Sequence, residues 1–424
     1  MASTASGGVA LLAIAWLATR RLTPAELGFF FSFLSLGALV QLADFGLSYA
    51  SLQTSGSLAG IGRLHEIPSL AARVRRWNLA TSSISTAAAA AIGSAIFSSH
   101  QSAMQSGGLA WKGPLAAYLL GVFLNQLTIP QMSLREGSGR VTQMWRLRLV
   151  QEWIAGLACL FALNAGWGLW SLSVLVAARA VVAAVWLTIG DRLPSAEGQP
   201  PYSLKRWMAE IWPFQWKIGV SWLSGFLIFR VFPPIILLEK GPVAAGQFGL
   251  AMSLMNLLIA VSSAWPLSQA ARYATLNAAR RFDELRREFP VMLAASTVVS
   301  ASATVICAGL LWQARQRGVV FALRLPDSAV TLLILAAAVP HHVVSCFAVL
   351  LRSEGREPLL IPSVLGGLAT VSIMWAAAHF GTLTNVAVAN FLCAALGILI
   401  VLFLFRRWPQ RHRAATRFES GGLK

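Results

Sequence analysis

Charge is scarce in this chain. Only 12% of its 424 residues are Asp, Glu, Lys or Arg, and 56% are hydrophobic, whereas roughly a quarter of the residues in a soluble domain are charged. Acids are scarcer still, with 16 Asp and Glu against 34 Lys and Arg. This composition excludes an ordinary soluble protein and favours one that lies in a lipid bilayer.

Several chemical signatures are also missing. The four cysteines lie in apolar segments without CxxC spacing, so we interpret them as small core residues rather than metal ligands. There is no GxxxxGK[ST] phosphate loop, which argues against direct drive by ATP. No set of nucleophile, base and orienting group is recognisable, so we expect no enzyme activity, no catalytic residue, no metal and no cofactor.

Long apolar segments dominate the chain instead. A segment of about 20 apolar residues crosses a hydrocarbon layer of roughly 30 Å as a helix, because in lipid a helix satisfies its own backbone. We therefore predict an all-α, polytopic membrane protein with twelve transmembrane helices. The predicted spans are residues 7–19, 27–50, 77–97, 115–133, 147–163, 168–189, 218–238, 244–265, 291–312, 329–350, 359–380 and 386–405.

The basic residues follow the loops. If loops alternate sides, 25 of the 34 Lys and Arg lie in the even-numbered loops and the C-terminal tail, and seven lie in the odd-numbered loops. The positive-inside bias then places both termini in the cytoplasm. Because the net charge of +18 is divided among several short loops, we expect no nucleic-acid partner.

The two halves of the chain resemble each other. Two pairs of residues recur with a shift of 218: Pro24 and Gly28 as Pro242 and Gly246, and Glu136 and Gly137 as Glu354 and Gly355. One shift at two distant places indicates a duplication, and an even number of spans per half gives both copies the same orientation. We predict two six-helix lobes related by a pseudo-two-fold axis along the membrane normal, which is a transporter architecture.

A proline-rich loop separates the halves. Residues 190–216 contain four prolines and several charges. We predict an N-terminal lobe at residues 1–189, a cytoplasmic linker at 190–216, a C-terminal lobe at 217–405 and a basic cytoplasmic tail at 406–424.

Two arginines lie deep inside predicted spans. Arg179 is near the middle of span 168–189, and Arg230 is slightly beyond the middle of span 218–238. A charge at this depth is costly unless it faces protein or a wet cavity, and a guanidinium binds phosphate through paired hydrogen bonds. We hypothesise that both arginines line a cationic, substrate-binding cavity between the lobes. For Arg179 the alternative is a structural role, such as a pair with a carboxylate.

Three further charged residues are candidates for a gate or for ion coupling. Asp44 lies near the cytoplasmic end of the second span, and the alternative for it is an ion pair with Arg135 or Arg148. Arg135 and Arg352 end the fourth and tenth spans in similar Leu-Arg motifs.

Polar residues inside the third and fourth spans could line a cavity for sugar, or join helices by hydrogen bonds, as small polar residues do in membranes. The candidates for cavity lining are Thr81, Ser82, Asn125 and Gln126. The tenth span also contains two adjacent histidines, His341 and His342. They could relay protons or pack at a proline kink.

Residues 22–53, LTPAELGFFFSFLSLGALVQLADFGLSYASLQ, carry a family resemblance. The segment resembles the opening of the Wzx-like polysaccharide (O-antigen and exopolysaccharide) flippases of the MATE/MOP exporter superfamily. The second half agrees, with GPVAAGQFGLAMSLMNL from Gly241 and Trp265-Pro266 at the end of the eighth span. The first span is shorter than we expect for this family, which points to a missing amino-terminal segment or a misplaced start.

The resemblance implies a flippase of the bacterial inner membrane that moves polyprenyl-diphosphate-linked oligosaccharide from the cytoplasmic to the periplasmic leaflet. Its partners would be this lipid-linked substrate, membrane lipids, and a polysaccharide polymerase with chain-length proteins. Two alternatives remain: a cation-coupled multidrug exporter of the same superfamily, and a membrane-embedded polysaccharide polymerase. A drug exporter would favour an acidic cavity, whereas the deep charges here are mainly arginines.

Overall fold

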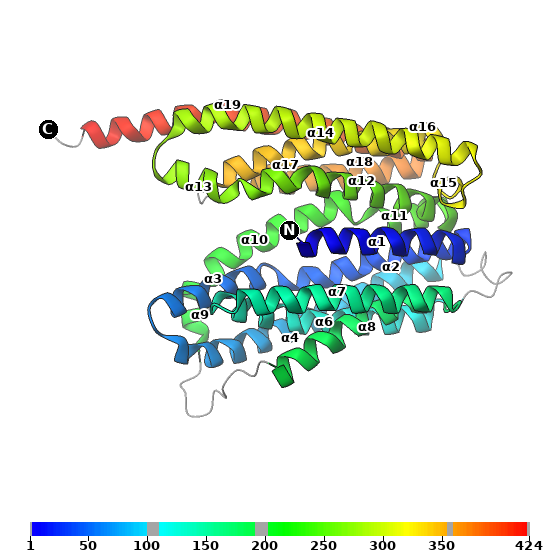
Figure 1. Ribbon diagram of the computed structural model, residues 1–424, viewed down its shortest axis with the longest axis horizontal. Coiled ribbons are helices and arrows are strands. Elements are labelled where there is room, and N and C mark those ends of the chain that lie inside the picture. The colour runs from blue at the N-terminus through cyan, green and yellow to red at the C-terminus, as the bar shows by residue number, and fades with distance from the viewer. Residues whose placement is uncertain (1, 100–109, 191–201, 354–358, 422–424) are drawn as a thin grey trace. The chain divides into compact units, whose positions relative to one another are not determined.

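The computed structural model describes residues 2–99, 110–190, 202–353 and 359–421, which form helices joined by short turns (Figure 1). By their internal contacts the residues fall into two compact units, Met1–Leu250 and Ala251–Lys424.

Within the described residues, the first unit consists of the helices that precede α12 (Pro242–Ser268) and of the start of α12 itself. The preceding helices are α1 (Ala2–Arg21), α2 (Pro24–Gln41), α3 (Leu47–Gly60), α4 (Ile67–Ser98), α6 (Lys112–Gly137), α7 (Val141–Asn164), α8 (Trp170–Val185), the short α9 (Leu204–Glu210), then α10 (Trp212–Phe229) and α11 (Phe232–Lys240). Helices α10 and α11 together form one candidate membrane span.

The second unit holds the rest of α12 and the helices that follow. These are α13 (Ala270–Ala278), α14 (Phe282–Gln316), α15 (Val320–Leu323), α16 (Ser328–Ala336), α17 (Ala338–Arg352), α18 (Leu360–Phe380) and α19 (Leu383–Gly421).

The predicted membrane architecture is confirmed. Ten segments of the described residues are long and apolar enough to span a bilayer. The two other predicted spans, 7–19 and 115–133, lie on α1 and α6, which are helices of 20 and 26 residues. The middle of α6 carries Asn125, Gln126 and Gln131, which makes it less apolar than its neighbours.

The helix boundaries repeat with the shift of 218 seen in the sequence. The second span begins at Pro24 and the eighth at Pro242, and the third span, Leu64–Ser98, has its counterpart in Phe282–Gln316 at both ends. Helix starts and ends are set by local capping and turns, so their repetition supports a duplication independently of residue identity. The second motif pair includes Glu354 and Gly355, which lie outside the described residues.

Three spans that we predicted as continuous helices are interrupted. The second span breaks between α2 and α3, where Phe45 and Gly46 have positive φ of 41° and 80°. The seventh breaks at Arg230, just before the two prolines at the start of α11, which cannot donate backbone hydrogen bonds. The tenth breaks at Ala337, between α16 and α17. Hydropathy averaged over a whole span did not reveal these breaks, because single charged residues such as Asp44 and Arg230 change the average little.

The break after α2 is the place where α10 packs. The Phe45 ring stacks on Trp212 with centroids 6.5 Å apart, and a Cβ atom on Gly219 would lie 2.4 Å from the same ring. A Cβ on Gly46 would lie 2.6 Å from the carbonyl oxygen of Gln215. These contacts place α10 in the first unit, so the compact units divide later in the chain than the predicted linker 190–216, and the predicted lobe limits stay a prediction.

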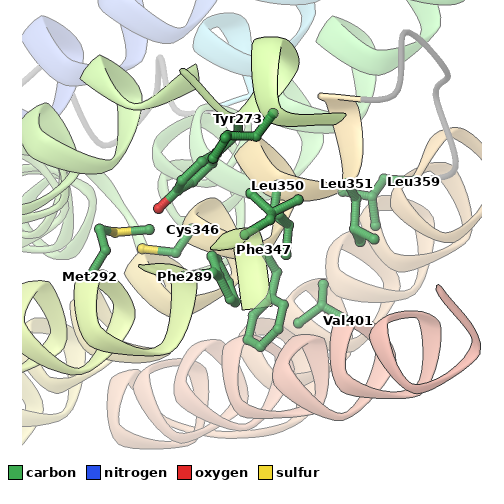
Figure 2. Close-up of a cluster of buried hydrophobic side chains, with 11 residues drawn as sticks. Tyr273, Phe289, Met292, Cys346, Phe347, Leu350, Leu351, Leu359 and Val401 are labelled. Atoms are coloured by element: carbon green, nitrogen blue, oxygen red, sulfur yellow. The ribbon is translucent and has the colours of Figure 1, made fainter. Parts of the chain in front are cut away.

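The second unit has an aromatic core (Figure 2). Phe289 of α14 packs edge-on against Phe347 of α17 at 5.1 Å, and both contact Phe405 of α19. Tyr273 of α13 adds a fourth ring at 6.3 Å from Phe289. Helices α13 and α14, which are consecutive in the chain, therefore meet the more distant α17 and α19 around one apolar cluster.

The outer surface is apolar as well. Phe380, Ile361 and Phe161 are 80%, 70% and 70% exposed, an arrangement that water would penalise and lipid does not. The described helices therefore present a surface suited to a bilayer.

Candidate functional site

Arg230 lies at the break in the seventh span. Its N–H still donates to the carbonyl of Phe226 at 2.9 Å, but its backbone has left the helical conformation, with φ −122° and ψ −22°. The side chain is exposed, and among the described residues no carboxylate pairs with it. A cation in a membrane span is costly without a counter-charge, so this guanidinium is suited to bind an anion.

Tyr118 is the residue that both predicted arginines share. Its ring is 3% exposed and stacks on Phe33 at 6.0 Å, and its hydroxyl lies over Gly37, where a Cβ atom would be 2.1 Å away. Both Arg179 and Arg230 lie within electrostatic range of the phenol. Tyr118 is thus a residue whose charge state both arginines influence, while a common site for the two guanidinium groups stays a prediction.

Arg179 has a carboxylate partner. One terminal nitrogen of its guanidinium lies 2.6 Å from Oε2 of Glu152, on the neighbouring helix α7, and Gln151 donates to the carbonyl of Arg179 at 2.8 Å. Nε of Arg179 is buried without a hydrogen-bond partner in the described chain. The alternative that we gave for Arg179, a pair with a carboxylate, is therefore the observed arrangement, and contact with substrate stays a prediction.

Sequence reasoning missed Glu152 and Tyr118. Glu152 lies inside the predicted span 147–163, so the rule that an ionisable residue in a span needs a partner would have found it. Nothing in the sequence distinguishes Tyr118, because its role depends on the packing of α6 against α2 and α8.

The predicted cavity-lining residues form hydrogen bonds between helices or within α4. Asn78 of α4 donates to the carbonyl of Gln126 at 3.0 Å and accepts from Ser82 at 3.1 Å. Asn125 of α6 accepts from Gln151 of α7 at 3.0 Å.

Thr81 donates to the carbonyl of Trp77 in its own helix at 3.1 Å. The amide of Gln126 is buried, and it has no partner among the described residues. Thr81 and Ser82 therefore bond within α4 and Asn125 bonds to α7, and the lining of a cavity by these residues and by Gln126 stays a prediction.

Asp44 caps the helix that follows the break. Its carboxylate accepts hydrogen bonds from the backbone N–H of Ser48, at 3.1 and 3.2 Å, and from the Ser48 hydroxyl. Asp44 is 2% exposed. Of the two arginines named as alternative partners for Asp44, Arg148 pairs with Glu136 at 2.6 Å and Arg135 donates to the carbonyl of Gln131.

The two predicted gate arginines differ in environment. Arg135 is 5% exposed and donates to the carbonyl of Gln131 at 3.0 Å, within its own helix. Arg352 is exposed at the last residue of α17. The structure places them in different compact units, and their role in gating stays a prediction.

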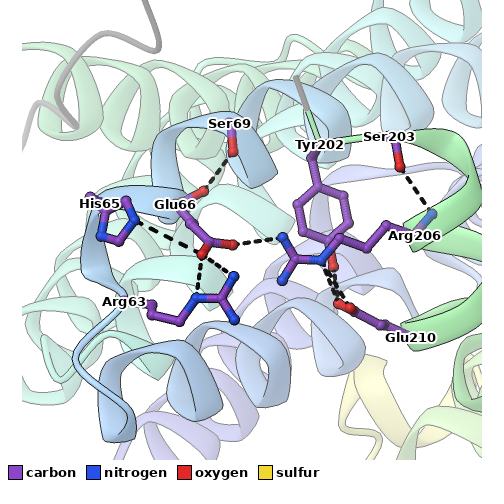
Figure 3. Close-up of polar contacts among 8 residues, drawn as sticks. All are labelled: Arg63, His65, Glu66, Ser69, Tyr202, Ser203, Arg206 and Glu210. Atoms are coloured by element: carbon purple, nitrogen blue, oxygen red, sulfur yellow. Dashed lines mark hydrogen bonds and ion pairs between the residues drawn. The ribbon is translucent and has the colours of Figure 1, made fainter. Parts of the chain in front are cut away.

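An ion-pair cluster joins the second and sixth loops (Figure 3). Glu66 accepts from Arg206 at 2.6 Å and pairs with Arg63, and Arg206 also binds Glu210 at 2.9 Å. Burial opposes ionisation of Glu210, but hydrogen bonds from Tyr202 and Arg206 hold the pKa of this carboxyl below its usual value.

The same cluster tests the alternation of loops. Arg63 and Arg206 come from the second and sixth loops, which we predicted to lie on one side of the membrane, and both bind Glu66. At the other side, Arg21 at the first loop donates to Asn164 at the fifth. The contacts agree with the predicted alternation, while the assignment of one side to the cytoplasm stays a prediction.

His342 links three helices of the second unit. Its ring lies 3.1 Å from the Ser296 hydroxyl, 3.4 Å from that of Ser263 and 3.4 Å from the Cys346 sulfur. The side chain is fully buried. These contacts fit packing at the kink before it. No group of His, Cys, Asp and Glu suited to a metal occurs among the described residues.

Comparisons with known proteins identify the fold. No protein-family model and no curated sequence matches the chain. A multidrug resistance MATE family transporter of the MOP superfamily, in an inward-facing conformation, superposes with a TM-score of 0.62 over 95% of this chain and 96% of that chain, at 14% identity.

Two further structures agree. A MOP superfamily transporter from Pyrococcus furiosus, whose binding pocket is described as having reverse polarity that suggests a different function, gives 0.59 over 96% and 93% of the chains at 16% identity. A MATE protein in complex with MaL6 gives 0.57 over 97% and 95% at 15% identity. The chain therefore has the two-lobed fold of MATE/MOP transporters.

Proposed function

We propose that this protein is a flippase, which moves a polyprenyl-diphosphate-linked oligosaccharide from the cytoplasmic to the periplasmic leaflet of a bacterial inner membrane. The fold supports membrane transport in general. The substrate class rests on the charges inside the spans and on the resemblance of residues 22–53 to polysaccharide flippases.

The observation that carries the proposal is Arg230. It is a cation inside a membrane span, exposed, and without a carboxylate partner among the described residues. Such a charge costs about 3 kcal/mol at the centre of a membrane helix. A diphosphate offers several oxygens to a guanidinium in a bidentate geometry, and would compensate this cost when the substrate is bound.

Arg179 and Tyr118 extend this site. Arg179 is held by Glu152 through one terminal nitrogen, at 2.6 Å, so its remaining N–H groups stay available to a second acceptor. The Tyr118 hydroxyl lies within electrostatic range of both arginines and can donate to an anion between them. The three side chains together form a positive site for the diphosphate, while the lipid tail stays in the bilayer.

The membrane potential favours this direction of transport. With the interior of the cell negative, outward movement of an anion gains about 2.3 kcal/mol per charge per 100 mV. The potential is therefore one source of energy for the proposed transport.

A second candidate, a cation-coupled multidrug exporter, is favoured by the similarity to a multidrug resistance transporter. Such a protein needs an accessible acid for its cationic drug. Here the two acids inside the predicted spans, Asp44 and Glu152, are engaged: Asp44 accepts from Ser48, and Glu152 pairs with Arg179. An anionic cargo therefore fits the described residues better.

One experiment distinguishes the flippase from the multidrug exporter. Protein is reconstituted into liposomes with a fluorescent polyprenyl-diphosphate oligosaccharide, and transfer between leaflets is followed by quenching from outside. We expect transfer by the wild type and at least a ten-fold slower rate for Arg230→Gln, with normal transfer for Arg317→Gln, which changes an exposed arginine just after α14. Equal rates for both variants, or export of ethidium without lipid transfer, would overturn the proposal.

A further inference from the structure

A groove of about 540 Å³ lies on the first unit between the end of α4 and the start of α6. Its wall on α4 consists of small residues, among them Ser94 and Ser98, and its wall on α6 includes Leu115 and Leu119. The small side chains of α4 leave space between the helices that larger residues would fill.

The surroundings of the groove belong to the lipid-facing surface. Ile92 on α4 is 44% exposed and Leu120 on α6 is 57% exposed, and both flank the groove in sequence. Apolar side chains with this exposure are stable in contact with hydrocarbon. A groove on such a surface is filled by a lipid chain rather than by water.

One end of the groove carries a positive charge. Lys112, the first residue of α6, is exposed and lines it, and its ammonium lies 5.8 Å from the centre of the Trp111 ring. Trp111 is 5% exposed and packs edge-on against Phe97 at 5.3 Å. A lysine beside a tryptophan at the end of a membrane helix marks the level of the lipid headgroups.

The lining is complementary to an anion. Among the described residues that line the groove there is no Asp or Glu, so nothing there competes for the Lys112 ammonium. Its apolar length and its positive end match an amphiphile with a negatively charged head.

We propose that this groove binds an anionic phospholipid, with the headgroup phosphate on the Lys112 ammonium and one acyl chain between α4 and α6. The site is separate from the Arg230 site and does not depend on the transported substrate. The lipid would brace α4 against α6, the helices that carry Asn78, Gln126 and Tyr118.

Native mass spectrometry of the full-length protein in a non-ionic detergent tests this. The probes are phosphatidylglycerol and phosphatidylcholine with identical acyl chains. We expect the wild type to retain phosphatidylglycerol preferentially, and Lys112→Gln to lower this preference about five-fold, the factor expected from one lysine near a headgroup. Lys240→Gln is the matched control, because Lys240 is also exposed at a helix end but lines no part of this groove.

A second variant tests the groove itself. Ser94→Leu fills the space and keeps the charge, so we expect it to reduce the binding of both lipids, while thermal unfolding in detergent without added lipid confirms that the variant is folded. Unchanged lipid binding in both Lys112→Gln and Ser94→Leu would overturn the proposal. Loss of a dimer in Ser94→Leu without loss of lipid would also overturn it, because a second copy of the chain would then occupy the groove.

Discussion

The backbone nitrogen of Gly28 lies 2.9 Å from the position that a Cβ atom on Gly246 would occupy. In return, a Cβ atom on Gly28 would lie 2.0 Å from the carbonyl oxygen of Pro242. Gly28 and Gly246 are equivalent under the shift of 218, and the equivalent pair Phe31 and Gly249 also meet, with a Cβ on Gly249 2.5 Å from the Phe31 ring. Equivalent residues contact each other where two copies of a repeat meet across a two-fold axis.

We expect Gly28→Ala to destabilise the protein by about 1–3 kcal/mol, because the added methyl group meets the backbone of Pro242, which cannot rotate away. Unfolding is measured with a thiol-reactive dye, which reports on the cysteines of the membrane helices as they become accessible. Gly225→Ala is the control, since a Cβ there has nothing within 4 Å. A melting temperature for Gly28→Ala equal to that of the control would contradict the close approach.

The pair Glu66 and Arg206 should show a measurable coupling. Their side chains are 15% and 30% exposed and 2.6 Å apart, so we expect a coupling energy of about 1 kcal/mol in a double-mutant cycle of Glu66→Gln and Arg206→Gln. The losses of stability in the two single variants would then add up to more than the loss in the double variant. Additive effects would show that α9 is held on the first unit by the apolar packing of Trp207 alone.

The same cluster predicts a dependence on pH. Glu210 has a pKa below its usual value of 4.5 in the folded protein because Tyr202 and Arg206 donate to it. A depressed pKa stabilises the fold above the unfolded value, and the stabilisation is lost as pH falls through the folded pKa. We therefore expect the stability difference between wild type and Arg206→Gln to be constant near neutral pH and to shrink below about pH 4.5. A difference that grows on acidification would contradict this assignment.

The carboxylate of Glu152 should matter mainly through Arg179. Glu152→Gln leaves the guanidinium without its counter-charge, and we expect a loss of about 2 kcal/mol, below the value for a fully buried pair because both side chains are partly exposed. The double variant Glu152→Gln with Arg179→Gln should recover most of this stability. If the double variant is no more stable than Glu152→Gln, the carboxylate has another partner.

Hydropathy and charge were sufficient to predict the helical membrane fold. The bilayer requires each spanning helix to be apolar over about 20 residues, whichever helices are its neighbours. The length of an apolar segment is therefore enough to predict a span. The duplication was also visible, because Gly28 and its equivalent Gly246 lie at a close contact between the repeats, where a Cβ atom on either residue would meet backbone atoms.

The candidate site was predictable only in part. Arg230 could be found because a charge in a span is conspicuous, but its position at a helix break depends on Pro233 and Pro234 in the following turn. The pairing of Arg179 with Glu152, and the electrostatic influence of both arginines on Tyr118, depend on which helices are neighbours. That information lies in long-range packing, to which single-sequence periodicity is blind.

Variants of Asp44 distinguish a role in helix capping from a role in ion coupling. In the structure it accepts from Ser48 at the start of α3, and asparagine caps a helix about as well as aspartate. We therefore expect Asp44→Asn to keep the melting temperature, and Asp44→Ala to cost about 1 kcal/mol.

A transport measurement on Asp44→Asn then decides between helix capping and ion coupling. If Asp44 only caps α3, Asp44→Asn transfers lipid-linked oligosaccharide at the wild-type rate at every pH, because the neutral amide keeps the helix in place. If the carboxylate takes up an ion or a proton during the cycle, Asp44→Asn is folded but loses transfer that depends on an imposed ion gradient. Since the backbone N–H and the hydroxyl of Ser48 already donate to this buried carboxylate, we expect the first result.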